Sequence, residues 1–224
     1  MTKKSDASLV RLLKGVEKFG KEVYPHEEDL FRKLANAQSP HTLFITCGDS
    51  RVDPNLITQS SPGELFIIRN VGNIVPQVDV KDPNITAALH YAVEVMKVKN
   101  IIICGHSNCG AMKALEQFDE TGKWPASDLA DWLKYAEAAL EKVKKTSFEK
   151  SEHVCCNLTE ANVRLQISHL KTYSFIQEAK KKRNINIKGW YYNIGTGTVS
   201  VVQDSDTPPL LASEELALLK KRRN

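Results

Sequence analysis

The sequence predicts an α/β fold in which helices flank a largely parallel central sheet of four to five strands. Two short apolar runs, residues 42–46 and 101–103, each lead into a glycine-containing turn, as buried strands of parallel sheets do. Between and after these runs lie segments with apolar residues at helical spacing. With 224 residues and a hydrophobic content of 42%, the chain can form one sizeable core, and a single domain over 1–224 is expected.

The first part of the chain, residues 1–37, is expected to be a helical arm. Apolar residues share one face of its first helix: Leu9, Leu12, Leu13, Val16 and Phe19. Pro25 opens a second helix, expected at about 26–37. An amphipathic helix must cover something, and both its own sheet and a neighbouring subunit remain open at this point.

The catalytic core is expected between residues 38 and 204. Strands are predicted at about 42–46, 64–69, 100–104, 186–192 and 199–202. Helices are predicted at about 53–58, 84–97, 108–121, 126–145 and 153–182. The Gly195-Thr196-Gly197 turn predicts that the last two strands pair as a hairpin. Residues 205–224 complete the chain with a helix of about 214–220 and a basic tail.

Charge and cysteine content narrow the class of protein. The net charge of +4 equals the charge of the Lys220-Lys221-Arg222-Arg223 tail, which could bind nucleic acid or an anionic membrane. Aromatic residues are not interleaved there, so we expect a solvated terminus and neither of these partners. Five cysteines, an odd number, favour a reducing compartment. The sequence has no apolar run near ~20 residues and no signal-peptide core, so a cytoplasmic location is expected.

Metal-ligating residues follow two of the predicted strands. Cys47 ends the first run, and His106-Ser107-Asn108-Cys109 follows the second. Because functional groups gather at the carboxyl ends of strands in such sheets, Cys47, His106 and Cys109 should meet. Two thiolates and one imidazole suit Zn²⁺, and no fourth Cys or His is obvious. The fourth position is therefore open to water or to Asp49.

Asp49 and Arg51 follow the first ligand closely enough to act beside the metal. The Asp49 carboxylate can accept the hydrogen of a zinc-bound hydroxide, and Arg51 can hold that carboxylate by a forked pair. The alternative is an ordinary surface Asp–Arg pair. The spacing from Cys47 fits the functional interpretation, and from these residues alone both interpretations remain open.

The remaining cysteines are expected to be structural. Cys104 lies inside the third predicted strand and suits a small core residue. Cys155 and Cys156 follow His153, which could indicate a second metal site or a redox pair. Their position at the start of a helix with apolar spacing favours buried or free thiols.

Together, Cys47-x-Asp49-Ser50-Arg51 and His106-x-x-Cys109 resemble the zinc site of the β-class carbonic anhydrases. The similarity covers about 26–204 and includes Pro62-Gly63-Glu64 and Arg69-Asn70-Val71. The family hydrates CO₂ reversibly to bicarbonate and a proton. The resemblance therefore implies a zinc lyase with one Zn²⁺ per chain, N-terminal helices that extend to a dimer partner, and a homodimer or a tetramer built from dimers.

The resemblance also implies the catalytic roles. Cys47, His106 and Cys109 would bind zinc, and zinc-bound hydroxide would attack CO₂. Asp49 and Arg51 would form the dyad that orients the hydroxide.

The same resemblance implies a substrate pocket. Gln38 matches a glutamine that hydrogen-bonds substrate across the dimer interface. Phe66, Val71 and Tyr91 match the apolar wall that holds CO₂, and Gly110 matches a glycine whose amide faces the pocket at a helix start, where anions such as bicarbonate are favoured. From the residues alone, plain core packing is the alternative for the three apolar side chains.

Two departures from the family pattern concern subclass and proton transfer. Phe44 stands where members of the bicarbonate-inhibited subclass carry Trp, so the sequence resembles the plant-type subclass. Val95 stands where some plant-type members have a His suggested as a proton shuttle, so the exit route of the proton is not assigned.

Two other functions use the same residues differently. One is hydrolysis of another cumulene, COS or CS₂, on this scaffold, and a narrowed pocket mouth would favour it. The other is a non-catalytic, zinc-stabilised interaction module, which steeply salt-dependent binding of RNA by the tail would favour. Carbonic anhydrase is the function we expect.

Overall fold

The computed structural model describes all residues except 1, 125, 146–151, 204–207 and 222–224. The side chains of residues 2–5 and 152–157 also lie outside the description. The chain divides into two compact units, Met1–Ser39 and Pro40–Asn224.

The N-terminal unit is helical, as the sequence predicts. Helix α1 (Thr2–Lys18) continues through the turns Phe19–Val23 and Tyr24–His26 into α2 (Glu28–Leu34). The ring of Phe31 contacts Phe19 and Tyr24, with ring centroids 5.8 and 5.5 Å apart, which fixes the bend between the helices. The apolar face of α1 is exposed, with Leu12 at 67% and Val16 at 68%.

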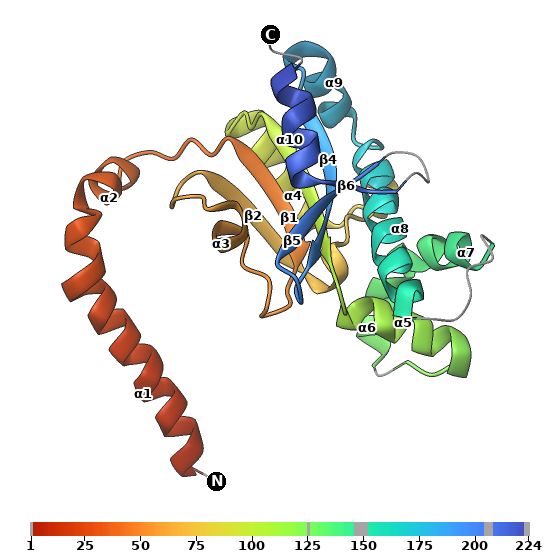
Figure 1. Cartoon of the computed structure of the whole chain (residues 1–224), viewed down its shortest axis with the longest axis horizontal. Coiled ribbons are helices and arrows are strands. Elements are labelled where there is room, and N and C mark those ends of the chain that lie inside the picture. The colour runs from red at the N-terminus through yellow and green to blue at the C-terminus, as the bar shows by residue number, and fades with distance from the viewer. Residues whose placement is uncertain (1, 125, 146–151, 204–207, 222–224) are drawn as a thin grey trace. The chain divides into compact units, whose positions relative to one another are not determined.

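The second unit contains a six-stranded sheet in the order β2-β1-β3-β4-β5-β6 (Figure 1). The first four strands in this order run parallel, and β5 and β6 are antiparallel to their neighbours. The strands are β1 (Thr42–Cys47), β2 (Leu65–Asn70), β3 (Asn100–His106), β4 (Asn186–Asn193), β5 (Thr198–Val202) and β6 (Leu210–Leu211). This confirms the predicted α/β fold with its largely parallel sheet, to which the structure adds the two-residue strand β6.

Two of the helices between the strands begin at aspartates whose side chains cap them. The Asp53 side chain accepts hydrogen bonds at the start of α3, and Asp82 does the same for α4. A proline follows each of them at the first helical position. The helices of this unit are α3 (Pro54–Thr58), α4 (Pro83–His90), α5 (Gly110–Thr121), α6 (Ser127–Leu133), α7 (Glu137–Lys145), α8 (Glu152–Leu170), α9 (Ser174–Arg183) and α10 (Ala212–Lys221).

The prediction of one continuous helix over 153–182 is wrong, because α8 ends at Leu170 and α9 begins at Ser174. Between them, the Thr172 hydroxyl accepts a hydrogen bond from the Val78 amide at 3.0 Å. The buried Tyr173 hydroxyl donates to the Pro76 carbonyl at 2.8 Å. Thr172 and Tyr173 therefore hold the loop at residues 76–78, which lies far away in the sequence. The apolar spacing continues across the break because both helices face the same core.

The sheet buries its two faces differently. Leu43, Ile101 and Ile103 face α8 in the larger core, whereas Phe44 and Ile102 belong to a smaller cluster on the other face. Helix α8 lies against β3 and β4, where a Cβ at Gly105 would come within 2.6 Å of the Thr159 methyl group. A Cβ at Gly189 would lie equally close to Val163. These two glycines therefore let α8 approach the sheet closely.

Some expectations fall on parts of the chain outside the description. The side chains of His153, Cys155 and Cys156 are among them, as are Arg222 and Arg223 of the basic tail. Within the described residues, no helix combines the length and apolar character that a membrane crossing requires.

Candidate metal centre

The structure brings the three expected metal ligands together. Cys47 is the last residue of β1, His106 is the last residue of β3, and Cys109 lies at the start of α5. One ligand atom from each residue lies within 4.8 Å of the others, and the two Sγ atoms are 4.0 Å apart. All three side chains are buried, with His106 at 0% exposure. Between the two later ligands, Asn108 turns the chain with a positive φ of 54°.

The hydrogen bonds of His106 leave one ring nitrogen available. Its Nδ1 lies 2.9 Å from the Ser107 carbonyl oxygen, which can only accept, so Nδ1 carries the proton and donates it. The lone pair is therefore on Nε2. This atom is buried and has no hydrogen-bond partner. A buried nitrogen in this state is costly unless a ligand satisfies it.

The donor set and its spacing fit a zinc ion. Tetrahedral zinc with Zn–S bonds of about 2.3 Å separates two thiolate sulfurs by about 3.8 Å. The observed separation of the Cys47 and Cys109 sulfurs is 4.0 Å. Two thiolates and one imidazole are ligands that zinc prefers, and they leave one of four tetrahedral positions free.

The pKa values of the two thiols also favour a bound cation. The hydrogen bond from Cys109 lowers the pKa of Cys47 to about 4, against the effect of burial. The pKa of Cys109 is raised, because its own ionisation would place a second thiolate beside Cys47 in a buried position. A divalent cation removes this repulsion, since a coordinating thiol is deprotonated.

Asp49 and Arg51 form the expected forked pair beside the ligands. Arg51 Nε donates to Asp49 Oδ1 at 2.9 Å, and Arg51 Nη2 donates to Oδ2 at 2.7 Å. These hydrogen bonds hold the pKa of Asp49 well below its usual range. Asp49 Oδ2 lies 3.8 Å from His106 Nε2. The carboxylate is therefore ionised, oriented and next to the ligand group.

Arg69 also contributes to the site, although the sequence motifs did not give it a role. From the end of β2, its Nη2 donates to the Asp49 carbonyl oxygen at 2.7 Å and its Nε donates to the Cys47 carbonyl oxygen at 3.3 Å. It thereby fixes the backbone that carries the first ligand and the carboxylate. Its signal in the sequence was a charged residue at the end of an apolar strand.

The expected apolar wall is not assembled around the ligands within one chain. Phe66 lies opposite Leu43, four residues before Cys47, so about 13 Å of strand separate Phe66 from the metal ligand. Its ring contacts Tyr91, with centroids 5.8 Å apart, and Tyr91 is 40% exposed. Val71 directly follows Asn70, the strand partner of Cys47, and is 46% exposed.

The two other expected pocket residues lie in different units. Gly110 is the first residue of α5, directly after Cys109, and space for a side chain is open there. Gln38 belongs to the N-terminal unit, and its role stays a prediction.

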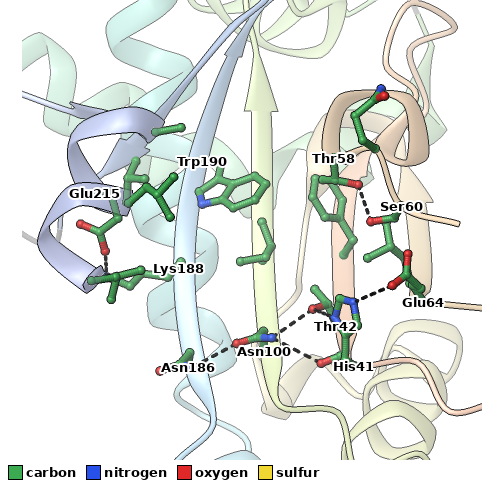
Figure 2. A pocket seen from close by; sticks show the side chains of 18 residues that line it. His41, Thr42, Thr58, Ser60, Glu64, Asn100, Asn186, Lys188, Trp190 and Glu215 are labelled. Carbon is green, nitrogen blue, oxygen red and sulfur yellow. Dashed lines mark hydrogen bonds and ion pairs between the residues drawn. The ribbon is translucent and has the colours of Figure 1, made fainter. Parts of the chain in front are cut away.

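A groove of about 620 Å³ lies at the opposite end of the sheet (Figure 2). Its lining includes Thr42, Asn100 and Asn186, the first residues of β1, β3 and β4, and the ion pair between Lys188 and Glu215. The metal ligands follow the carboxyl ends of β1 and β3 and do not line it. The candidate site is therefore recognised by its ligand chemistry and not by cavity size.

A parallel α/β sheet with two cysteines and one histidine converging at its carboxyl edge is an arrangement that could hold a metal ion. The model of the carbonic anhydrase family matches residues 42–199. A carbonic anhydrase of Helicobacter pylori strain J99 is 41% identical over 191 residues, covering 83% of this chain and 86% of that protein. One of Synechococcus elongatus is 38% identical over 191 residues, covering 84% and 70%.

Solved structures agree with these relatives. The structure of the β-carbonic anhydrase CcaA has a TM-score of 0.82 and 38% identity, covering 87% of each chain. One of two tetrameric β-carbonic anhydrases from Sordaria macrospora has a TM-score of 0.78 and 28% identity, covering 88% of this chain and 97% of that one. The chain therefore belongs to the β-carbonic anhydrase family, whose members are lyases.

Proposed function

We propose that this protein catalyses the reversible hydration of CO₂ to bicarbonate and a proton with one Zn²⁺ per chain. The observation that carries the proposal is the convergence of Cys47, His106 and Cys109 within 4.8 Å, with the Nε2 lone pair of His106 unpartnered. When bound, zinc supplies a Lewis acid that lowers the pKa of a water molecule to about 7 and makes a nucleophile available.

In this proposal Asp49 orients the nucleophile. Its Oδ2 accepts the hydrogen of the attacking oxygen and so aims the lone pair at the carbon of CO₂. The forked pair with Arg51 keeps Asp49 ionised and turned in one direction. The Gly110 amide at the start of α5 would favour the bicarbonate anion that forms.

We infer that a second copy of the chain completes the substrate wall. Phe66 lies far along the strands from the ligands of its own chain, and Tyr91, whose ring contacts Phe66, is exposed. The exposed apolar face of α1 supports assembly as a homodimer or tetramer, and a relative from Sordaria macrospora is described as tetrameric. Gln38 would reach the pocket in the same assembly.

A complementation experiment tests the shared wall. One chain carries Tyr91→Ala together with Phe66→Ala, and the other carries His106→Ala. If the wall comes from the partner, mixed oligomers contain one site with an intact metal centre and an intact wall, and activity returns on mixing. If each chain supplies its own wall, every site has a defect and mixing restores nothing.

The central experiment measures zinc content and CO₂ hydration on the same sample. We expect one zinc per chain and a stopped-flow hydration rate that rises with pH as the metal-bound water ionises. Zinc-loaded protein without hydration activity would contradict the proposed function.

We propose the plant-type subclass and a cytoplasmic location. Phe44 is buried against Trp190, with ring centroids 5.8 Å apart, and so offers no indole nitrogen at the position where the other subclass carries Trp. The bacterial and cyanobacterial carbonic anhydrases among the relatives support the location.

A further inference from the structure

Helix α8 carries a stripe of buried polar side chains that the proposed catalysis does not use. Asn162 and Gln166 are 0% exposed, and His169 is 5% exposed. Buried amides are retained only where their hydrogen bonds are satisfied, because an unsatisfied one is costly. The partners of these side chains therefore indicate what the stripe does.

All three side chains hold the loop that follows β2. Gln166 Oε1 accepts a hydrogen bond from the Val75 amide at 2.9 Å, and His169 Nδ1 lies 2.8 Å from the Val75 carbonyl oxygen. Asn162 Nδ2 donates to the Gly72 carbonyl oxygen at 3.0 Å. Residues 72–75 are thus anchored to a helix about 90 residues away in sequence.

The direction of these hydrogen bonds is set by the backbone. The Val75 N–H can only donate, so the Gln166 oxygen must face it. The Gln166 nitrogen then donates to Asn162 Oδ1 at 2.8 Å. The Asn162 nitrogen must therefore face Gly72, whose carbonyl can only accept. A single orientation of both amides satisfies this relay.

The loop that the relay holds lies directly against the metal centre. Gly72 is two residues past Asn70, the strand partner of Cys47. A Cβ at Gly72 would lie 3.2 Å from the Ala111 Cβ, two residues past Cys109. The Gly72 backbone, with a φ of 80°, thus lies beside the segments that carry two of the expected ligands. In agreement with this position, the Gly72 backbone contributes to the lowered pKa of Cys47.

Helix α8 is also held firmly against the sheet that carries the ligands. The close approach at Gly105, the residue before His106, leaves no space for a side chain between α8 and β3. The helix therefore sets the distance between β3 and the loop at Gly72.

We propose that Asn162 and Gln166 are positioning residues of the metal centre, which hold the backbone of residues 72–75 beside Cys47 and the start of α5 and so strengthen metal binding. The inference rests on the proposed function for the identity of the ligands. It concerns residues that do not touch metal or substrate themselves.

The test replaces Asn162 by leucine, a side chain of similar size without a donor. In Asn162→Leu the Gly72 carbonyl loses its partner, whereas Gln166 keeps Val75 and the Tyr135 carbonyl. We expect the zinc affinity, measured by competition with a chelator, to fall by about tenfold or more, as is typical for residues behind a metal ligand. In the cobalt-substituted protein, the sulfur-to-metal charge-transfer band should shift, since the backbone beside Cys47 is no longer held in one position.

Ile167→Ala is the matched control, because Ile167 is buried on the same helix but faces the sheet at Gly189. It should lower the melting temperature and leave the zinc affinity and the cobalt spectrum unchanged. If Asn162→Leu leaves both metal readouts at wild-type values, or if Ile167→Ala changes them equally, the inference is wrong. If the leucine variant does not fold, Asn162→Ser replaces it, because the serine side chain is too short to reach Gly72. Its zinc affinity and cobalt spectrum then test the inference in the same way.

The experiment also separates this inference from the proposed function. Wild-type protein that binds zinc without hydrating CO₂ contradicts the function, yet the affinity and the spectrum still test the relay. Full hydration by the wild type with unchanged metal binding in Asn162→Leu contradicts the relay alone.

Discussion

The metal centre and the aromatic pair of Phe66 and Tyr91 differ in where a single chain places them. The three ligand residues lie together, whereas the aromatic pair lies away from them. Three ligand atoms lie within 4.8 Å of one another, although they come from two strands and a helix start. Phe66, by contrast, lies opposite Leu43 and not opposite Cys47. Both features match residues of the family, and Phe66 contacts Tyr91 within the chain, but the pair does not lie beside the ligands of the same chain.

Sheet register explains the difference. Parallel neighbours end at the same edge, so residues just past two strands are brought together whatever lies between them in sequence. A residue early in β2 is fixed near the start of β1 by the same register. This register is the reason for the proposal that the wall beside each metal centre comes from another copy of the chain.

The largest expected effect is at the metal centre. His106→Ala removes the imidazole ligand, and CO₂ hydration should fall by about a thousandfold or more, because the metal supplies several kcal/mol and each ~1.4 kcal/mol is a factor of ten. Zinc content should fall with it. The matched control is Cys104→Ala on the same strand, a buried thiol outside the ligand group whose pKa burial raises to about 12. Loss of zinc in this control as well would show that strand integrity, and not ligation, is measured.

The next effect is at the dyad. Arg51→Ala frees the Asp49 carboxylate, which already lies 3.8 Å from His106 Nε2, to turn toward the metal position. Hydration at neutral pH should fall by about tenfold to a hundredfold, while zinc stays bound. Stopped-flow rates and metal analysis on the same preparation check this. Wild-type turnover in the variant would mean that the forked pair has no catalytic role.

A smaller effect is expected at the aromatic pair. Tyr91→Ala removes an exposed ring without touching a ligand, so kcat/KM for CO₂ should fall by about tenfold, the weight of 1–2 kcal/mol of apolar contact. Zinc content should equal that of the wild type. An unchanged kcat/KM in the assembled oligomer would remove Tyr91 from the substrate wall and leave the metal centre as the whole site.

The smallest effect concerns the loop behind the metal centre. Burial lowers the pKa of His169, so the folded protein keeps this imidazole neutral at a pH where the unfolded chain takes up a proton, below about 6.5. The free energy of unfolding should therefore fall as the pH drops from 7 toward 5. His169→Asn keeps a donor for the Val75 carbonyl and cannot titrate, so its decline over this range should be shallower. Equal slopes for both proteins, from denaturant unfolding at each pH, would contradict the assignment.

The sequence correctly predicted the features that depend on residues close together in the chain. The apolar runs of β1 and β3 and the spacing of Asp49 and Arg51 from Cys47 are all local. The break between α8 and α9 was missed because Tyr173 and Thr172 bond to a loop almost 100 residues earlier. Arg69 and Asn162 were missed for a similar reason, since their partners are carbonyl groups, which leave no side-chain signature.

By itself, the sequence determined which two cysteines and one histidine would come together and which carboxylate would lie beside them, because zinc chemistry restricts the residue types and parallel strands end at one edge. The tertiary structure alone decided which loop lies behind the Cys47 sulfur, which helix holds that loop, and how far Phe66 lies from the ligands. Those distances arise from strand register and from the close seating of α8 on glycines, and packing between distant segments sets both.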